Sequence, residues 1–577
     1  MKKLLRYLKP YTKESLIAPL FKLLEACFDL LVPLIVRRIM NNAIPAEDTS
    51  AIVRSCGVLV FCAVVGLTCT LIAQYFAARA AVGLGTDLRR DLFKKIQGYS
   101  YGQTDRDGTA TLITRMTADV NQVQTAVNHV LRLLLRSPII VLGSALFAFL
   151  VDPRGAIPFT VVIPLLAVVV FSIMLGGVPL YRKVQKGLDR VTALTRENLT
   201  GVRVIRAFRR ESDETDRFDR ANRLQTAMQN TVGKLSALMN PLAMLIVNGG
   251  IIALLYSGAI KVDGGSMTKG DVYALTNYMS QILVELVKLA NTVIVFNKGL
   301  ACAARIGAVL DEETGASVDP SLPTPASAAG TAVSFDRVCL TYSEGADPSL
   351  TDISFSATSG ETVGIIGSTG SGKTSVVNLI ARFYDATDGV VSVDGVNVKA
   401  RDPEPLRAEI GIVPQKAVLF HGTVRSNLLW GSADATDDEL WQALETAQAK
   451  DFVAQKEGGL DAPVAQNGKN FSGGQRQRLT IARALVRKPR ILILDDSSSA
   501  LDYATDAALR GAIRRLDYNP TVFLISQRTA SIAHADKILV LDDGKQVGLG
   551  KHEELLETCP VYREIYESQY KKEEADA

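Results

Sequence analysis

The residues best suited to chemistry form a glycine-rich run at 367–374, Gly-Ser-Thr-Gly-Ser-Gly-Lys-Thr. An apolar β-branched segment (363–366) precedes the run, and a helical segment opens at Ser375. Glycines let the backbone curl until several N–H groups point inward, and a helix N-terminus adds partial positive charge. The pattern therefore predicts a phosphate-binding loop, in which Lys373 reaches the terminal phosphates and the Thr374 hydroxyl binds magnesium. The strand before and the helix after disfavour a glycine turn without function.

A second candidate is the apolar run Ile-Leu-Ile-Leu-Asp at 491–495, which is followed by Asp496. A strand that ends in an acid suits a carboxylate that positions magnesium beside phosphates, and Asp495 takes that role. A plain exit from strand to loop is the alternative. Because the phosphate loop is also present, the magnesium interpretation is favoured.

A third candidate is Phe-Ser-Gly-Gly-Gln at 471–475, directly before a long helical run. Ser-Gly-Gly at a helix start is an anion site of the same physical kind. It could also be an N-cap with a flexible turn. Two phosphate-type sites in one domain make sense if the second serves a nucleotide held by another subunit.

Six apolar stretches are long enough to cross a bilayer core, which takes about 20 residues. They lie near residues 15–37, 51–78, 130–151, 156–179, 236–260 and 271–298. The connections at 79–129 and 180–235 are long, helical in composition and rich in Lys and Arg. The positive-inside bias therefore places these connections and the N-terminus in the cytoplasm. Six spans return the chain to that side, so we expect a multi-pass cell-membrane protein with a cytoplasmic soluble half.

Composition supports this division of the 577 residues. The 47% apolar content excludes a disordered chain, and a net charge of +4 gives no argument for nucleic acid. A linker rich in Ala, Ser, Pro and Thr occupies 312–330, which separates a helical membrane domain at 1–311 from a soluble α/β domain at 331–577. Apolar strand candidates at 362–367, 491–495 and 521–526 alternate with helical stretches, as in a mostly parallel sheet.

Charges inside the first and last spans have two interpretations. Lys22, Glu25 and Asp29 share roughly one helical face, and Glu285 and Lys288 are one turn apart. Such groups either line a transport pathway or form internal ion pairs. The ion pair is favoured for the first span, and the two interpretations are equal for the last. Further cavity-lining candidates in the last span are Asn277, Tyr278, Met279 and Gln281.

Together these motifs resemble a half-transporter of the ATP-binding-cassette (ABC) exporter family, with six membrane helices fused to one P-loop nucleotide-binding domain that includes an α-helical subdomain. The resemblance runs almost end to end. Segments 100–119 and 197–211 are similar to the family's cytoplasmic coupling segments. The resemblance implies ATP and Mg²⁺ as cofactors, with the Tyr342 ring stacked on adenine. The other residues that it implies for ATP binding are Gly367, Ser368, Thr369, Gly370, Ser371, Gly372, Lys373, Thr374, Ser375 and Gln415. It further implies Mg²⁺ ligands Thr374, Gln415 and Asp495, and contacts to a partner's nucleotide from Phe471, Ser472, Gly473, Gly474, Gln475 and Asp502.

The departures from the family pattern are informative. Asp496 stands where the family has its catalytic glutamate, and Gln527 where it has its switch histidine. Aspartate withdraws the carboxylate by roughly 1 Å, and a misplacement of that size can cost about 10²-fold. Glutamine cannot carry a proton or a positive charge. Lys373 therefore belongs to a catalytic set in which two positions, Asp496 and Gln527, are degenerate because they depart from the family pattern. The signature segment 471–475 departs only in Phe471, and Gln466 replaces the acid expected just before that segment.

These departures imply an ATP-hydrolysing translocase whose own site is slow. The expected partner is a second, non-identical half-transporter, and the expected cargo is an amphiphilic drug, lipid or peptide exported across the membrane. An ATP-sensing regulatory or channel-like subunit is the main alternative. An importer of a chelated metal on the exporter fold is a second. The membrane half excludes a soluble cassette that acts on nucleic acid.

Overall fold

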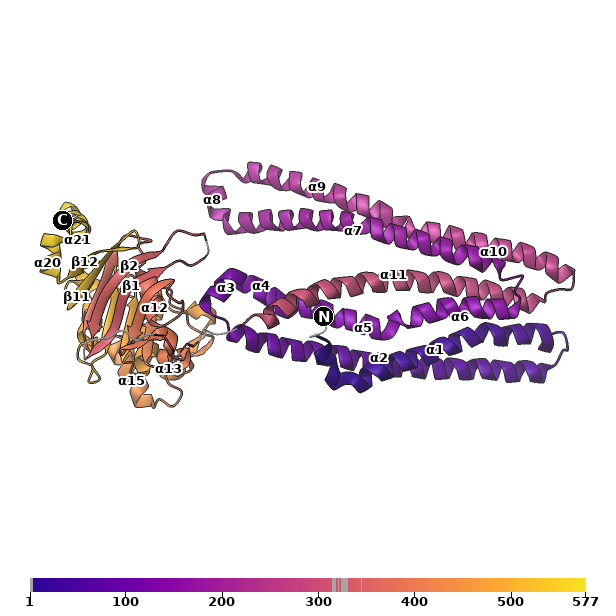
Figure 1. Ribbon diagram of the computed structural model, residues 1–577, viewed down its shortest axis with the longest axis horizontal. Coiled ribbons are helices and arrows are strands. Elements are labelled where there is room, and N and C mark those ends of the chain that lie inside the picture. Colours follow the sequence, from indigo (N-terminus) through magenta and orange to yellow (C-terminus); the bar gives the residue numbers. More distant parts are fainter. Residues whose placement is uncertain (1–3, 314–317, 320, 323–329, 344, 577) are drawn as a thin grey trace. The chain divides into compact units, whose positions relative to one another are not determined.

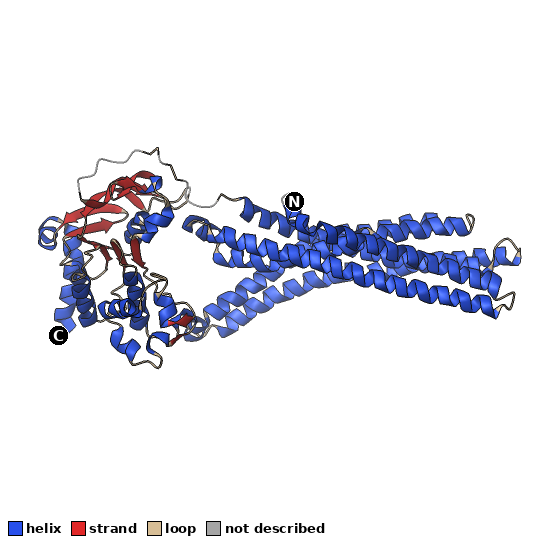
Figure 2. Cartoon of the chain, turned by 90° about the horizontal axis from the view of Figure 1, so that it is seen from below, coloured by secondary structure: helices blue, strands red, loops and turns tan. Residues whose placement is uncertain are grey.

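The computed structural model describes residues 4–313, 318, 319, 321, 322, 330–343 and 345–576. Its internal contacts divide the chain into two compact units. Unit 1 comprises Met1–Gln97 and Thr109–Glu313, and unit 2 comprises Gly98–Gly108 and Thr314–Ala577. Figure 2 draws unit 1 as helices, and the strands that it draws lie in unit 2. The coarse expectation of a helical part followed by an α/β part is confirmed.

Unit 1 is built from long helices joined by short turns (Figure 1). In chain order its helices are η1 (Leu4–Tyr11), α1 (Thr12–Arg38), η2 (Ile39–Ala43), α2 (Thr49–Gln97), α4 (Thr109–Thr114), η3 (Arg115–Asp119), α5 (Val120–His129), η4 (Val130–Leu134), α6 (Arg136–Val151), α7 (Ile157–Thr200), α8 (Val202–Ala207), α9 (Glu211–Ala237), α10 (Met239–Asp263) and α11 (Lys269–Asp311). At 49 residues, α2 is about 70 Å long, roughly twice the thickness of a bilayer core. The cation-rich connections are therefore mostly continuations of membrane helices.

Five helical stretches among the described residues are long and apolar enough to span a membrane: Thr49–Gln97, Thr109–Val151, Ile157–Thr200, Glu211–Asp263 and Lys269–Asp311. The expected first span, 15–37, forms the continuous helix α1. It falls outside this group of five because Lys22, Glu25 and Asp29 interrupt its apolar surface. The composition of the helices thus supports five spans, and the sixth stays a prediction.

The core of unit 1 lies where α11 packs against α1, α6, α7 and α10. It is filled by large apolar side chains with almost no exposed surface, among them Phe159, Leu166, Leu254, Leu275 and Ile282. Tyr278 and Met279, expected to line a cavity, belong to this packed core and are 0% exposed. The Tyr278 hydroxyl donates to the Leu30 carbonyl oxygen at 2.8 Å, so this polar group is satisfied inside the core. That part of the cavity expectation is wrong.

Unit 2 is organised by a ten-stranded sheet of order β5-β4-β1-β2-β12-β11-β3-β10-β9-β6. The strands β11, β3, β10, β9 and β6 are parallel, and β5, β4, β1 and β2 are antiparallel. The strands are β1 (Thr331–Leu340), β2 (Leu350–Thr358), β3 (Thr362–Gly367), β4 (Asp388–Val393), β5 (Val396–Asn397), β6 (Ile410–Val413), β9 (Ile491–Asp495), β10 (Thr521–Ile525), β11 (Lys537–Asp542) and β12 (Lys545–Gly550), with β7 (Gly422–Thr423) and β8 (Pro463–Val464) paired separately.

Helices cover the parallel part of the sheet on both faces, as its sequence requires. Along β9, Leu492 and Leu494 join one apolar cluster and Ile491 and Ile493 join another. The helices of unit 2 are α3 (Tyr101–Asp107), α12 (Lys373–Ile380), η5 (Val398–Ala400), α13 (Pro403–Ala408), α14 (Val424–Leu428), α15 (Asp437–Thr446), α16 (Lys450–Ala454), η6 (Gly459–Asp461), η7 (Gln466–Gly468), α17 (Gly473–Val486), α18 (Tyr503–Ile513), α19 (Thr529–Ile532), α20 (His552–Thr558) and α21 (Pro560–Asp576).

Candidate functional site

A cavity of about 320 Å³ in unit 2 lies at the carboxyl ends of the parallel strands. Because those strands are parallel, the loops that follow them meet at one edge of the sheet. The lining includes most of the residues expected to bind nucleotide and magnesium: Tyr342, Thr369, Gly370, Gly372, Lys373, Thr374, Ser375, Gln415, Asp495, Asp496 and Gln527, together with Ser349 and Ile525. Gly367, Ser368 and Ser371 lie in the same loop but do not line this cavity.

The phosphate loop owes its shape to glycine. Gly370 and Gly372 have φ angles of +87° and +92°, which side-chain-bearing residues rarely adopt. A Cβ atom at Gly372 would also stand 2.8 Å from the Ser349 carbonyl oxygen. Lys373 opens α12, and its Nζ donates to the carbonyl oxygens of Gly367 at 2.9 Å and Ser368 at 2.6 Å. The loop thus wraps around its own lysine.

The expected magnesium ligands lie together in this cavity. The Thr374 hydroxyl donates to the Asp495 carboxylate, with distances of 3.0 and 3.2 Å to its two oxygens. Burial raises the pKa of Asp495 and lowers the pKa of Lys373. A hydroxyl, a carboxylate and the Gln415 amide are the hard oxygen donors that magnesium prefers, with phosphate oxygens to complete its shell. The residues therefore fit Mg²⁺.

Asp496 lies on the cavity wall in a left-handed backbone conformation, with φ of +45°. Its backbone N–H donates to the Ile525 carbonyl oxygen at 3.1 Å, which fixes the start of the loop after β9. Gln415 Nε2 donates to the Asp496 carboxylate at 3.3 Å. The short carboxylate is thus joined to the expected magnesium ligand Gln415.

Gln527 lines the same cavity and follows β10. Helix α21 holds its loop through Gln569, whose Nε2 donates to the Gln527 carbonyl oxygen at 2.7 Å. Gln569 Oε1 accepts from the backbone N–H and the hydroxyl of Thr529, both at 2.9 Å. Sequence reasoning missed Gln569, since a glutamine in a charged C-terminal helix carries no motif. The contact makes it a positioning residue for the loop that holds Gln527.

Tyr342, expected to stack on adenine, is held by two contacts. Its hydroxyl is 2.8 Å from Ser375 Oγ at the start of α12, and its ring meets Tyr384 edge-on with centroids 4.8 Å apart. The Tyr384 hydroxyl donates to Asp105 of α3. Tyr101, also in α3, stacks on Phe383 with centroids 4.2 Å apart. Part of the first expected coupling segment is therefore linked by aromatic contacts to the residue expected to bind adenine.

The signature residues are placed by the N-terminus of α17. The Ser472 hydroxyl accepts from the Gln475 N–H at 3.3 Å, and the Gln475 side chain accepts from the Ser472 N–H at 3.0 Å, which forms a capping box. The Phe471 ring is 4% exposed and packs near Phe452, so the aromatic replacement serves the core. Asp502 caps α18 by accepting from the Thr505 backbone N–H at 2.8 Å and from the Thr505 hydroxyl at 2.9 Å. Phe471, Ser472, Gly473, Gly474, Gln475 and Asp502 do not line the cavity that contains Lys373.

The charges expected in the membrane spans form one cluster in unit 1. Lys22 pairs with Glu25 inside α1, and both are buried, as the favoured interpretation expected. Lys288 pairs with Glu285 at 3.0 Å. Sequence reasoning missed Arg136, whose guanidinium joins α1 to α11 through Asp29 and Glu285. Gln281 lines a cavity beside this cluster.

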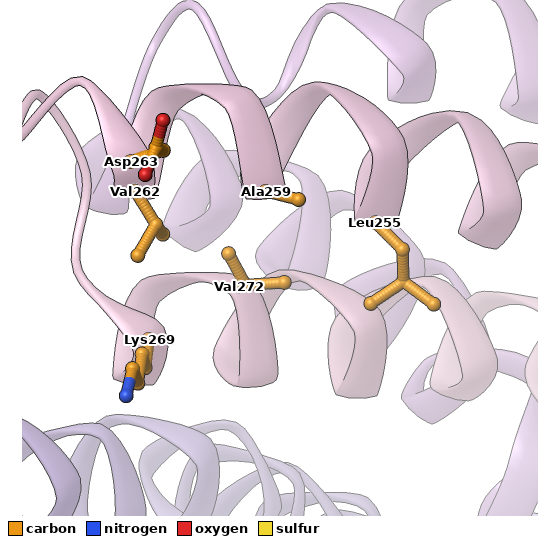
Figure 3. A pocket seen from close by; sticks show the side chains of 6 residues that line it. All are labelled: Leu255, Ala259, Val262, Asp263, Lys269 and Val272. Atoms are coloured by element: carbon orange, nitrogen blue, oxygen red, sulfur yellow. The ribbon is translucent and has the colours of Figure 1, made fainter.

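The hollow at the turn between α10 and α11 has a volume of about 560 Å³. It is lined by Leu255, Ala259, Val262, Asp263, Lys269 and Val272. Figure 3 shows apolar side chains of the two helices facing one another there, whereas Asp263 and Lys269 do not converge. Because its two charged side chains do not converge, we interpret this hollow as a gap between packed helices and not as a candidate binding site.

Comparisons with known proteins agree with this geometry. Residues 15–286 match the family described as the ABC transporter transmembrane region, and residues 350–499 match the family described as ABC transporter. The second range contains the phosphate loop, Gln415, the signature and Asp495.

Relatives align over nearly the whole chain. An uncharacterized ABC transporter ATP-binding protein of Mycobacterium tuberculosis is 38% identical over 98% of this chain and 97% of its own length. One of Bacillus subtilis is 35% identical over all of both chains, and an ATP-dependent lipid A-core flippase of Idiomarina loihiensis is 28% identical over 99% and 97%. The solved structure of a bacterial Atm1-family ABC exporter with ATP bound has a TM-score of 0.81, covers 97% of this chain and 98% of its own, and is 24% identical. That likeness establishes the fold.

Proposed function

Since this chain belongs to the ABC transporter family, whose ATP-binding domain drives transport, we propose that it is the slow-site subunit of a heterodimeric exporter. In this proposal its own cavity binds ATP tightly and hydrolyses it slowly. Its signature segment serves a competent site on a different partner subunit. The cargo is an amphiphilic drug, lipid or peptide.

The observation that carries the proposal is the position of Asp496 and Gln527. Both line the cavity that contains Lys373, Thr374 and Asp495, so both lie where phosphate is expected. When bound, Mg²⁺ neutralises phosphate charge, and Thr374, Asp495 and Gln415 would hold it there. Lys373 binds the terminal phosphates, but Asp496 is too short to polarise a water molecule well, and Gln527 cannot carry a proton.

The capped N-terminus of α17 supports the second half of the proposal. Ser472 to Gln475 form an ordered helix start in which Gly473 is exposed and Gly474 is half-buried, and the first N–H groups of a helix lack intrahelical partners, as an anion site requires. These residues do not line the chain's own cavity, which leaves them available to a nucleotide on a partner. The proposed domain limits are 1–311 for the membrane domain, 312–330 for the linker and 331–577 for the nucleotide-binding domain.

Closure of the two cassettes must reach the membrane helices, and we assign this to segments 100–119 and 197–211. Helix α3 is linked to Tyr342 through Tyr384, as described above. Helix α8 and its flanks expose apolar side chains, with Phe208 74% exposed, which suits docking to a partner. Helix α1 acts as the sixth span in this account, which places the N-terminus and the nucleotide-binding domain in the cytoplasm.

An ATPase comparison tests the proposal. The full-length chain is purified alone and together with a second half-transporter. That partner has Glu directly after its magnesium-binding aspartate, and His at the position that corresponds to Gln527. We expect slow turnover by the chain alone and rapid turnover by the pair. Brisk hydrolysis by the self-paired chain, lost on Asp496→Asn, would falsify the slow-site assignment.

Matched substitutions in the pair locate the active site. Asp496→Asn should leave turnover within a few-fold, whereas replacing the partner's glutamate by glutamine should abolish it. Equal losses from the two changes would contradict the asymmetry.

The same two residues also favour one alternative, an ATP-sensing regulatory or channel-like subunit in which binding alone matters. Reconstituted vesicles distinguish the two functions. ATP-dependent, directional movement of a dye or lipid by the pair supports the exporter, and a regulator would show none.

A further inference from the structure

A cavity of about 390 Å³ in unit 1 lies among α1, α6 and α11. Its polar lining includes Asp29, Arg136, Gln281 and Glu285, and the remaining wall is mostly aliphatic. The three charged residues are 107 and 149 positions apart along the chain and meet only in the fold. A mixed wall of this kind suits a molecule with a polar head and an apolar body.

Arg136 organises the charges at one end of this cavity. Its Nη1 donates to Glu285 Oε1 at 2.5 Å, and its Nη2 donates to Asp29 Oδ2 at 2.8 Å and lies 3.7 Å from Glu25 Oε1. The Ser137 hydroxyl donates to the other oxygen of Glu285 at 2.8 Å. The side chains of Arg136 and Glu285 are 10% and 5% exposed, so this pair is buried.

Asp29 differs from the other two carboxylates. Glu25 has Lys22 as a second cation, and Glu285 has Lys288. Among the described residues, Asp29 has only Arg136, which it shares, and its side chain is 46% exposed. With their cations the three carboxylates form a cluster of zero formal charge, and Asp29 is the most exposed carboxylate in it.

We propose that this cavity binds the cationic head of an amphiphilic substrate, with the Asp29 carboxylate as its counter-ion. This inference rests on the proposed export function and names the substrate class. The exposed oxygen of Asp29 meets the head group. Arg136 acts as a positioning residue that holds Asp29, and the aliphatic wall of Val32, Ile140 and Val284 packs against the apolar body.

An anionic head group fits poorly here. Both terminal nitrogens of Arg136 already donate to carboxylates and its Nε is buried, so its positive charge is matched within the cluster and faces the cavity little. The exposed carboxylate of Asp29 would repel it. Because a low-dielectric environment strengthens charge interactions, this discrimination is larger in a membrane cavity than in water.

Binding of two probes of matched shape and opposite charge tests the proposal. Equilibrium dialysis measures tetraphenylphosphonium and tetraphenylborate separately against the full-length chain in detergent micelles, with empty micelles as reference and no nucleotide. We expect saturable binding of the phosphonium at least about tenfold tighter than that of the borate. Equal binding of the two ions, or tighter binding of the borate, would overturn the proposal.

Substitutions then locate the counter-ion. Asp29→Asn should weaken phosphonium binding about tenfold, whereas Asp29→Glu, which keeps the charge, should largely preserve it. Asp263→Asn is the matched control, because Asp263 lines the separate hollow between α10 and α11. Unchanged phosphonium affinity in Asp29→Asn would refute Asp29 as the counter-ion. The same result is expected if a cation of a partner subunit already neutralises Asp29, so that arrangement would also overturn the proposal.

The comparison of the two probes on the wild-type chain holds even if a variant fails to fold. Since no ATP is hydrolysed, failure here leaves the slow-site proposal intact.

Discussion

The nucleotide cavity of unit 2 and the charged cavity of unit 1 both set a buried cation against carboxylates, yet they are built differently. In unit 2, Lys373 donates to backbone carbonyl oxygens of its own loop, which follows β3. It shares a cavity with Asp495 and Asp496 at the end of β9, which β10 separates from β3 in the sheet. In unit 1, Arg136 is itself the link between helices, since it joins Asp29 of α1 to Glu285 of α11.

This difference separates binding from stability. A cation that is held by the backbone of its own loop remains available to a bound ligand, so removing this cation weakens ligand binding. A cation that neutralises buried carboxylates from other helices is part of the folded core, so its removal leaves unpaired buried charge.

The largest expected effect tests this contrast directly. Arg136→Met should destabilise the protein by about 3–5 kcal/mol and lower its melting temperature by roughly 10 °C, because Glu285 loses its strongest partner in a buried site. Lys373→Met should leave the melting temperature without nucleotide nearly unchanged and abolish the rise caused by ATP. Thermal unfolding in detergent, with and without ATP, measures both.

Arg132→Met is the matched control for the first variant. Arg132 lies one turn earlier and, within the part of the chain that the structure describes, bonds only Asn128, at 3.4 Å. A melting temperature as low as that of Arg136→Met would show that any arginine here is structural and would remove the contrast.

A smaller effect is expected from restoring the degenerate positions. The double variant Asp496→Glu, Gln527→His should raise ATP turnover by the self-paired chain by about 10²-fold, since it lengthens the carboxylate by one methylene and supplies a titratable ring. Steady-state phosphate release measures it. The single variant Gln527→Asn, which restores neither group, is the control, and a double variant as slow as wild type would argue against the two side chains as the cause.

The aromatic contacts near Tyr342 predict a further, weaker effect. Tyr384→Leu removes the edge-on contact to the Tyr342 ring, which is worth about 0.5–1.5 kcal/mol, so ATP affinity should fall roughly three- to tenfold. Tyr384→Phe keeps the ring and loses only the bond to Asp105, so its ATP affinity should stay close to wild type. Titration with a fluorescent ATP analogue distinguishes these outcomes. Equal losses would mean that the hydroxyl, and not the ring, supports the site.

The smallest effect is expected at Gln569. Gln569→Leu removes three hydrogen bonds to the Gln527 loop, and turnover by the pair should change a few-fold with the KM for ATP unchanged. Ser568→Ala is the control, since the hydroxyl of Ser568 donates within its own helix, to the Ile565 carbonyl oxygen. A change in KM without a change in kcat would contradict a positioning role.

Sequence reasoning succeeded where the signal is local. The strands at 362–367 and 491–495 were predicted with the bounds that the structure has, because each is a short apolar run that ends at a glycine or an acid. Most of the residues expected around phosphate line one cavity for the same reason: a strand, a glycine loop and a helix specify their own geometry.

It failed where contacts join distant elements. Arg136 stands at the start of an apolar helix and shows its role only beside Asp29 and Glu285. Tyr278 and Met279 lie on the helix face that other helices cover, which the sequence of α11 alone does not reveal. The helix α3 lies within residues 1–311, the range proposed for the membrane domain, yet its contacts group it with unit 2, which its own sequence does not indicate.

The fate of ATP in this chain's own site decides whether that site hydrolyses nucleotide slowly. The full-length chain, purified alone, is loaded with radiolabelled ATP and Mg²⁺, freed of unbound nucleotide, and sampled over time to measure retained ATP and ADP. The slow-site account predicts that the retained nucleotide remains ATP over many times the turnover period of the complete pair. Conversion of that nucleotide to ADP within a single such period would contradict it.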